Sequence, residues 1–228
     1  MKLQDRLDEI ERQLLSVIDA QERSALAAAI ERLRMMQIVE QGLAEGDTLP
    51  DFALPDAAGE IVTSAGLLDR GPLVLAFFRG PWCPYCSLMV EALDQLRPEI
   101  EALGASCVAV APLPVGELAA MAGQRGLSLT LLSDADSAYA GVCGVRFEMT
   151  AESTALYGRL AARFGQTIPG QDAPGGWVLP VPTTYVAGRD GVIAYSFGDA
   201  NWARRADPGE ILSAVERLVR QPAPAVSA

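Results

Sequence analysis

Two cysteines separated by two residues are the part of this sequence best suited to chemistry. Cys83 and Cys86 lie in the stretch FFRGPWCPYCSLM, residues 77–89, directly after a tryptophan. The two-residue spacing lets both sulfurs meet within one helical turn, near the distance of a disulfide. Such a pair could hold a metal, form a structural disulfide, or exchange electrons with a substrate.

The composition argues against a metal site. The chain contains no histidine, which removes His-based catalytic dyads and triads and every zinc site that needs an imidazole. A zinc site made of four cysteines would have to recruit Cys107 and Cys143 without a second CxxC motif. No Gly-rich phosphate loop is present, and nothing in the sequence calls for a metal, a flavin or a nucleotide. We therefore expect no cofactor.

The N-terminal stretch indicates the cellular compartment, and the compartment decides whether a structural disulfide is expected. The segment MKLQDRLDEIERQLL is charged and amphipathic and lacks the apolar centre of a secretory signal. No segment approaches the roughly 18 apolar residues that a membrane helix needs. The expectation is a cytoplasmic protein, a compartment in which structural disulfides are rare. The four cysteines are then expected to be thiols or redox groups.

The charge balance of the chain argues against certain classes of binding partner. The chain has 228 residues and a net charge of −11, from 29 acidic and 18 basic side chains. Such a balance, with no Lys- or Arg-rich run, argues against nucleic acid and against anionic membrane surfaces. The length suits one domain of moderate size plus an appendage.

The residues around the cysteine pair predict the elements that would position it. Residues 71–78, GPLVLAFF, are typical of a buried central strand, and residues 84–103 have the apolar spacing of a helix, with a kink expected at Pro98. Ligands and chemistry collect beyond the carboxyl ends of such strands. The N–H groups at the start of the helix lower the pKa of a thiol there. Position, spacing and compartment together predict a redox dithiol.

The rest of the pattern predicts a mixed α/β protein. We expect one long helix over residues 3–43 and a final helix from Pro208 to Arg220, capped by Asp207. The stretch 150–182 has a poorly defined pattern, which is helical at first and then becomes that of a Gly/Pro-rich loop. Between the first and last helices we expect short strands on either side of a turn at 58–59 and further strands at 105–112 and 127–134. Helices are expected at 115–124 and from Ser137. A hairpin is expected over 183–198, with its turn at 189–191.

Four segments of the chain resemble the segments of a known protein family. DFALPDAAGEIVT, LVLAFFRGPWCPYCSLMVEAL, CVAVAP and LSDADSAYAGVCGV resemble, in order, the segments of peroxiredoxins in the alkyl hydroperoxide reductase/thiol-specific antioxidant family. The likeness is greatest to the peroxiredoxin-like branch, whose members carry W-C-P-Y-C and later a segment similar to PVPTTYVAGRDGVI. The resemblance spans about residues 47–220. It implies a thioredoxin-like fold, in which helices flank a mixed central sheet, with an added N-terminal helical arm.

The resemblance also assigns roles, with departures from the family pattern. In the peroxiredoxin signature P-x-x-x-T-x-x-C, Cys86 takes the place of the peroxide-attacking cysteine, Cys83 that of the threonine and Arg79 that of the proline. The family's activating arginine falls at Pro182, where thioredoxins place a proline that is typically cis. We therefore expect a cis bond between Val181 and Pro182.

Two mechanisms follow from these roles. In a peroxidase, the Cys86 thiolate attacks a peroxide, becomes a sulfenic acid and is resolved by Cys83. In a thioredoxin-like oxidoreductase, the more exposed Cys83 attacks a disulfide and Cys86 resolves the mixed disulfide. The replaced threonine and arginine favour the second mechanism, whereas the order of the segments favours the first. A third alternative is a non-enzymatic binding protein that responds to redox state.

For three residues near the cysteine pair, the sequence does not decide between a functional and a structural role. Arg79 could supply positive charge or be a surface residue, Trp82 could shield the pair or only pack, and Tyr85 could donate a hydrogen bond to a substrate oxygen or only pack. Cys107 is expected in the core. Cys143 could be a remote resolving cysteine, although the CxxC pair makes one unnecessary.

The leading hypothesis is a peroxiredoxin-type peroxidase that acts on hydrogen peroxide or organic hydroperoxides. Residues 1–46 are predicted as a helical extension, 47–222 as the thioredoxin-like domain and 223–228 as a flexible tail. The resemblance implies a thioredoxin- or glutathione-type thiol as the reductant, and the amphipathic N-terminal stripe favours a homodimer. Arg204 and Arg205, after the hairpin, are predicted to be solvated.

Overall fold

The computed structural model describes residues 2–168 and 176–220. Its centre is a five-stranded sheet in the order β5-β4-β3-β8-β9. Strand β3 pairs in parallel with β4 and antiparallel with β8, so the sheet is mixed, as predicted. The strands are β3 (Leu73–Phe77), β4 (Ser106–Ala111), β5 (Thr130–Ser133), β8 (Thr183–Ala187) and β9 (Ile193–Gly198).

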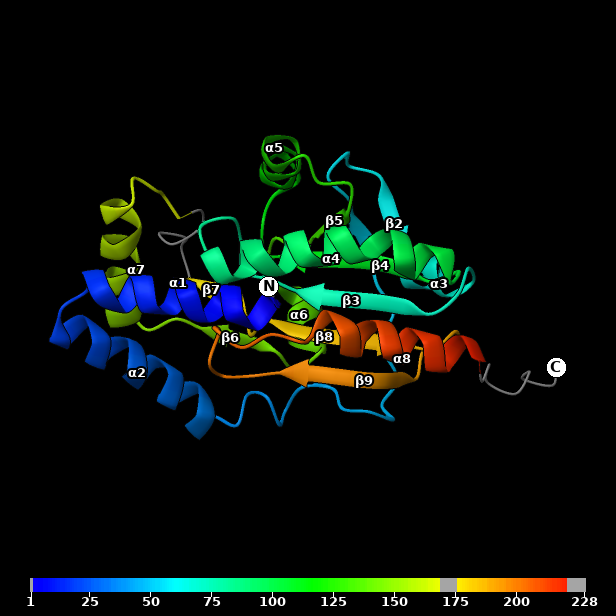
Figure 1. Ribbon diagram of the computed structural model, residues 1–228, viewed down its shortest axis with the longest axis horizontal. Helices are drawn as coiled ribbons and strands as arrows, with labels where there is room; N and C mark the ends of the chain where they lie inside the picture. Colours follow the sequence, from blue (N-terminus) through cyan, green and yellow to red (C-terminus); the bar gives the residue numbers. More distant parts are fainter. Residues whose placement is uncertain (1, 169–175, 221–228) are drawn as a thin grey trace.

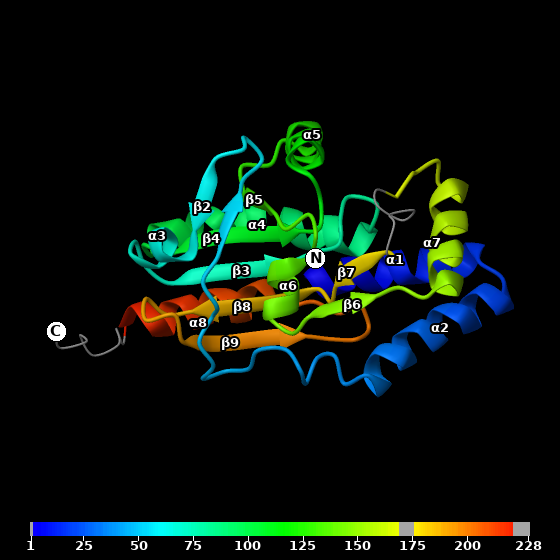
Figure 2. The ribbon, with the colours of Figure 1, turned by 180° about the vertical axis from the view of Figure 1, so that it is seen from behind.

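Helices cover both faces of this sheet. Helices α4 (Pro84–Ala102) and α8 (Pro208–Arg220) lie next to each other on one face (Figure 1), and α6 (Ala138–Val142) lies on the other (Figure 2). Helix α5 (Val115–Arg125) packs beside β5. The prediction of helices flanking a mixed sheet is confirmed. Helix α4 continues through Pro98, and Asp207 caps α8 as expected, accepting a hydrogen bond from the N–H of Gly209 at 2.8 Å.

Smaller elements complete the domain. Strands β1 and β2 form the predicted short hairpin, with Gly59 at φ +88° in its turn, where a residue with a side chain would be strained. A second pair, β6 and β7, was not predicted, because residues 166–182 carry the Gly and Pro signals of a loop. The elements are β1 (Ala53–Pro55), β2 (Ile61–Thr63), α3 (Ser64–Leu68), β6 (Arg146–Glu148), α7 (Ala151–Arg163) and β7 (Val178–Pro180).

The N-terminal arm is two helices, so the prediction of one helix over 3–43 was wrong. Helix α1 (Leu3–Val17) ends where Ile18 is extended, and α2 (Ala20–Met35) starts anew at Asp19. The Asp19 side chain accepts from the N–H of Glu22 at 2.8 Å, and Glu22 accepts from the N–H of Asp19 at 3.1 Å. This reciprocal capping box stabilises a new helix start, so a continuous apolar spacing does not require a continuous helix.

The arm packs against the domain. Leu3 and Leu7 of α1 are buried, and Arg6 forms an ion pair of 3.5 Å with Glu91 of α4. Helices α1, α2 and α7 gather beyond the carboxyl end of β3, as Figures 1 and 2 both show. None of the described helices combines the length and the apolar character that a membrane span requires.

The prediction of a cis bond before Pro182 was also wrong. Among the described residues no peptide bond is cis. Cis X-Pro bonds serve mainly in tight turns, whereas here Val181 and Pro182 link β7 directly to β8, and the N–H of Val181 donates to the carbonyl of Val145 at 2.8 Å. The predicted tail at 223–228 and part of the predicted loop, residues 169–175, lie outside the described residues.

Candidate active site

The cysteine pair lies at the junction between β3 and α4, as predicted. Cys83 is the N-cap of α4, Pro84 is its first residue and Cys86 belongs to its first turn. Gly80 makes the approach to the helix possible: its φ is +144°, and a Cβ there would lie 2.7 Å from Nε1 of Trp82. The N–H of Cys83 donates to the carbonyl of Gly80 at 3.2 Å, which closes the loop.

Cys86 is completely buried and surrounded by hydrogen-bond donors. Its Sγ accepts from the backbone N–H of Arg79 at 3.5 Å and from Nη2 of Arg205 at 3.5 Å. Burial opposes a charge on Cys86, but a hydrogen bond from Cys83, the charges of Arg205 and Arg79, and the Arg79 N–H outweigh it. The pKa of Cys86 is therefore well below its ordinary value, which favours the thiolate form.

Cys83 has the opposite character. Burial, together with its hydrogen bond to Cys86, raises the pKa of Cys83 well above the ordinary value of a thiol, although Arg79 Nη2 donates to its Sγ at 3.2 Å. Both cysteines are unbonded thiols in this structure. The pKa values of the two cysteines are therefore moved apart, and Cys86 is the one on which a negative charge is favoured.

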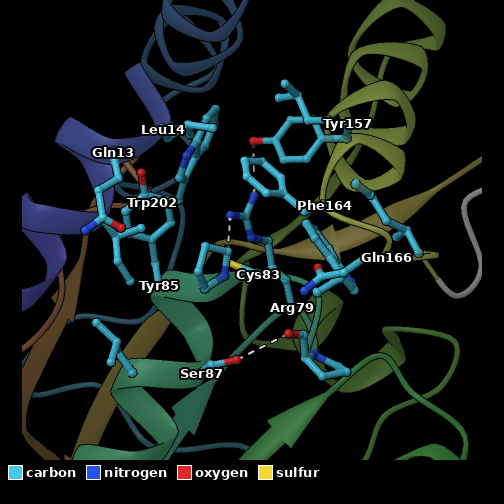
Figure 3. Close-up of a pocket in the computed structure, with 18 of the residues that line it drawn as sticks. Gln13, Leu14, Arg79, Cys83, Tyr85, Ser87, Tyr157, Phe164, Gln166 and Trp202 are labelled. Carbon is cyan, nitrogen blue, oxygen red and sulfur yellow. Dashed lines mark hydrogen bonds between the residues drawn. The ribbon is translucent and has the colours of Figure 1, made fainter. Parts of the chain in front are cut away.

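Arg79 is buried, with 2% of its surface exposed, so the alternative of a surface residue is wrong. Its guanidinium lies 5.1 to 5.7 Å from the ring centres of Trp82, Tyr157 and Trp202, an aromatic cage that holds the cation by cation–π attraction. Its Nη1 donates to the hydroxyl of Tyr157 at 3.5 Å (Figure 3). The cage places the cation beside Cys83.

Arg205 reaches the site from the loop between β9 and α8, so the prediction of a solvated segment was wrong for this residue. The N–H of Asn201 donates to Asp199 at 2.7 Å, and the N–H of Ala203 donates to the Asn201 side chain at 3.0 Å. These two turns shape the loop. Nη1 of Arg205 then donates to the carbonyls of Trp202 and Arg204. The loop buries Arg205 and leaves Arg204 exposed.

A cavity of about 720 Å³ opens beside Cys83. Cys83 lines it, whereas Cys86 does not. Figure 3 shows Leu14 and Tyr85 on one side of Cys83 and Tyr157 and Phe164 on the other. The walls come from α1, α2, α4, α7 and the loops that carry Arg79 and Trp202.

The predicted aromatic neighbours of the pair both lie at the cavity. Trp82 is buried and packs against Tyr157 and Trp177, with ring centres 5.9 and 5.1 Å apart. Tyr85 lines the cavity, and burial, with the charge of Glu11, raises its pKa. The hydroxyl of Tyr85 thus stays protonated. Pro182 is buried but is not among the cavity-lining residues.

The other two cysteines, Cys107 and Cys143, are buried, and within the described part of the chain no arginine donates a hydrogen bond to either sulfur. Burial, with the nearby charge of Glu101, raises the pKa of Cys107 to about 12. Burial also raises the pKa of Cys143 to about 12, even though Tyr139 forms a hydrogen bond with it. Both are therefore unreactive thiols at neutral pH. Across the described part of the chain, no group of three or more Cys, Asp or Glu side chains is placed to hold a metal ion.

Three residues of the site were missed by reasoning from sequence. Tyr157 and Trp202 complete the cage around Arg79, and Arg205 contacts Cys86. The only available signal was the segment WARRADP, whose tryptophan and arginines follow a hairpin. Nothing in its local pattern says which of the two arginines turns inward.

Comparison with known proteins gives the family. The model of the AhpC/TSA family matches residues 46–196, and the chain belongs to this family. A candidate peroxiredoxin of Mycobacterium tuberculosis is 36% identical over 101 residues, which cover 44% of this chain and 66% of that protein. The chain thus aligns with slightly less than two thirds of the length of this relative.

Solved structures share the fold. Peroxidoxin BcpB from Mycobacterium tuberculosis superposes with a TM-score of 0.59 at 24% identity, over 77% of this chain and 98% of that chain. Peroxiredoxin Q from Xanthomonas campestris gives a TM-score of 0.55 at 17% identity, over 78% and 99%. The thioredoxin-like fold that the family resemblance implies is therefore confirmed.

Proposed function

We propose that this protein is a thiol peroxidase that reduces hydroperoxides through the Cys83–Cys86 pair. The observation that carries the proposal is the buried Cys86 sulfur, which accepts hydrogen bonds from the backbone N–H of Arg79 and from the Arg205 guanidinium. Membership of the AhpC/TSA family supports it, and the resemblance to the family's P-x-x-x-T-x-x-C signature implies that Cys86 is the attacking cysteine.

The chemistry follows from the protonation of the pair. The Cys86 thiolate attacks the terminal oxygen of ROOH, the O–O bond breaks, and RO⁻ takes up a proton and leaves as ROH. Cys86 is then a sulfenic acid. The Cys83 sulfur attacks it, a disulfide forms and water leaves. Two equivalents of an external thiol reduce the disulfide and restore both cysteines.

The two arginines would stabilise the reacting oxygens. Arg79 lines the cavity, and within the described residues its buried Nε has no hydrogen-bond partner, so one donor remains for a peroxide oxygen. Arg205 takes over the charge role that the family gives to an arginine at the position of Pro182 here. Because Cys83 and not Cys86 lines the cavity, attack by Cys86 requires the Cys83 side chain to turn aside.

Further parts of the proposal concern partners. A thioredoxin-type thiol is the reductant that the family implies. The homodimer and the cytoplasmic location expected from the sequence remain predictions. So do the domain boundaries at residues 46 and 222.

The test is a stopped-flow titration of the reduced protein with hydrogen peroxide. The fluorescence of Trp82, which is adjacent to Cys83 in sequence, would report oxidation in the wild type, Cys83→Ser and Cys86→Ser. We expect fast oxidation that survives Cys83→Ser and is lost in Cys86→Ser. Slow oxidation in all three proteins, with fast reaction of the wild type with a model disulfide, would overturn the proposal in favour of a disulfide oxidoreductase that attacks through Cys83.

A further inference from the structure

Arg79 is a buried cation held by aromatic rings instead of by a carboxylate. Its guanidinium lies 5.2 Å from the ring centre of Trp82, 5.7 Å from that of Tyr157 and 5.1 Å from that of Trp202. None of the ion pairs found within the described residues includes Arg79. Buried charges are usually paired with an opposite charge. The three rings take that place here.

The rings also pack against one another, so the cage is a closed unit. The ring centre of Tyr157 lies 5.9 Å from that of Trp82 and 5.8 Å from that of Trp202, and both pairs meet edge to face. The three rings come from the loop before α4, from α7 and from the loop between β9 and α8. Elements far apart in sequence are thus brought together around one guanidinium.

A cage of neutral rings leaves the charge of Arg79 free to act on its neighbours. A carboxylate partner would cancel most of the field of the cation at nearby atoms, whereas an aromatic face attracts the cation without carrying a net charge. The Tyr157 hydroxyl, which accepts from Arg79, is uncharged as well, because burial raises its pKa to about 12.

The neighbour that receives this charge is Cys83. Nη2 of Arg79 donates to the Cys83 sulfur at 3.2 Å, whereas the guanidinium that donates to Cys86 is that of Arg205 (Figure 3). Arg79 reaches Cys86 only through its backbone N–H. The two buried guanidinium groups are therefore divided between the two sulfurs.

We propose that the aromatic cage positions Arg79 to activate Cys83 for the second chemical step, its attack on the oxidised Cys86. Tyr157 and Trp202 are then positioning residues for this step. The inference rests on the proposed peroxidase function and adds the residues that govern the resolution of the sulfenic acid.

Oxidation of Cys86 changes what opposes a charge on Cys83. In the reduced pair, burial is the main cause that raises the pKa of Cys83, and the hydrogen bond and the charge of Cys86 add to it. A sulfenic acid at Cys86 is neutral, so the charge repulsion disappears. Burial then remains as the main obstacle, and the charge of Arg79 opposes it more than that of Arg205 does.

The second step balances without a further reagent. The Cys83 sulfur gives an electron pair to the Cys86 sulfur, and the S–O bond of the sulfenic acid breaks. The proton of the Cys83 thiol passes to the departing hydroxide, which leaves as water. The disulfide carries no charge, so Arg79 has to stabilise only the thiolate that develops on Cys83 during the attack.

The first test separates the two steps by stopped-flow fluorescence. The phase whose rate is proportional to the hydrogen peroxide concentration reports oxidation of Cys86, and the phase independent of that concentration reports disulfide formation. Trp202→Leu opens the cage, Trp202→Phe restores a ring, and Trp82 remains as the reporter. We expect the second rate constant, relative to the first, to fall about tenfold in Trp202→Leu and to recover most of this loss in Trp202→Phe.

The hydroxyl of Tyr157 allows a matched pair of variants. Tyr157→Phe keeps the ring and removes the acceptor of the Arg79 hydrogen bond. Tyr195→Phe removes a hydroxyl that donates to Glu210 at 3.0 Å in an exposed hydrogen bond. The same ratio of rate constants should fall about threefold in Tyr157→Phe and should stay at the wild-type value in Tyr195→Phe.

The second test needs no peroxide. In Cys86→Ser, residue 86 is neutral, as it is in the sulfenic acid, and the pKa of Cys83 follows from the pH dependence of its alkylation by iodoacetamide, with the modified residue identified by mass spectrometry. Adding Arg79→Met or Trp202→Leu to this variant should raise the pKa of Cys83 and slow its alkylation at pH 8 about tenfold. Arg79→Lys should recover part of the rate.

The inference requires both effects in variants whose folding circular dichroism confirms. A second phase that slows without a rise in the pKa of Cys83 would mean that the cage only supports the fold around the pair, and would overturn the inference. A raised pKa with an unchanged ratio of rate constants would overturn it as well. A wild type without a peroxide-dependent phase would refute the proposed function, and the alkylation alone would then decide whether Arg79 activates Cys83.

Discussion

Cys86 differs from the other three cysteines of the chain in the direction in which its surroundings shift its pKa. All four are buried, yet the pKa of Cys86 is well below the ordinary value of a thiol, while the pKa values of Cys107 and Cys143 are raised to about 12. Burial acts in the same direction on all of them, because removal from water disfavours the charged form.

What differs is the set of donors around each sulfur. Cys86 accepts from Arg205, from the N–H of Arg79 and from the Cys83 thiol, and it lies in the first turn of α4. Cys107 lies within β4, where burial and the charges of Glu101 and Asp94 raise its pKa and the charge of Arg97 only partly opposes them. The comparison teaches that the pKa of a buried cysteine falls only where several donors together outweigh burial, as they do at Cys86 and do not at Cys83, which has Arg79 as a donor.

The largest expected effect concerns which cysteines react. Cys86→Ser should slow oxidation by hydrogen peroxide by about 1,000-fold or more, because it removes the attacking thiolate. The double variant Cys107→Ala/Cys143→Ala should react like the wild type. Thiol titration of the denatured protein after one equivalent of peroxide should show two thiols lost from the wild type. Loss of Cys107 or Cys143, identified by mass spectrometry, would contradict the contrast.

The next largest effect concerns Arg205, whose guanidinium donates a hydrogen bond to Cys86. Arg205→Met should lower the rate constant with peroxide by about 100-fold, since a buried charged donor near the reacting atoms is lost. The absorbance of the thiolate at 240 nm should titrate at higher pH in this variant, and Arg205→Lys should recover part of both effects. Arg204→Met, on the exposed neighbour, is the matched control. A lower rate without a shift of the titration would mean that Arg205 only supports the loop.

The pH profile gives a third test. Because only the thiolate attacks, the rate should be constant across neutral pH and should fall when the pH drops below the lowered pKa of Cys86. A thiol with the ordinary pKa of about 8.5 would instead gain activity as the pH rises from 7 to 9. Stopped-flow rates between pH 4.5 and 9 distinguish the two profiles, and the second would refute the assignment of the charge to Cys86.

The smallest expected effect is on the stability of the folded protein. Cys107→Ala should lower the free energy of unfolding by about 1 kcal/mol, because it leaves a small void beside β4, and should leave the peroxide rate unchanged. Urea unfolding measures the first quantity and stopped flow the second. A change in rate would give Cys107 a role that its surroundings do not predict.

Several elements were predictable because their signals are local. The apolar run before Cys83 and the proline after it define the end of a strand and the start of a helix, and both lie where expected. The hairpin of β8 and β9 and the helix α8 follow the same rule. The break between α1 and α2 was missed because the apolar spacing continues across it, although Asp19 and Glu22 carry the capping signal.

The sequence by itself determined that two cysteines lie at a strand–helix junction, since their spacing, the proline and the apolar run act within a few residues of one another. Only the tertiary structure decided which groups meet that dithiol. Arg205 is 119 residues from Cys86 and Tyr157 is 78 residues from Arg79, and the choice of Arg205 over Arg204 depends on how one loop packs. The cavity, likewise, exists only because the arm and α7 pack against each other across the site.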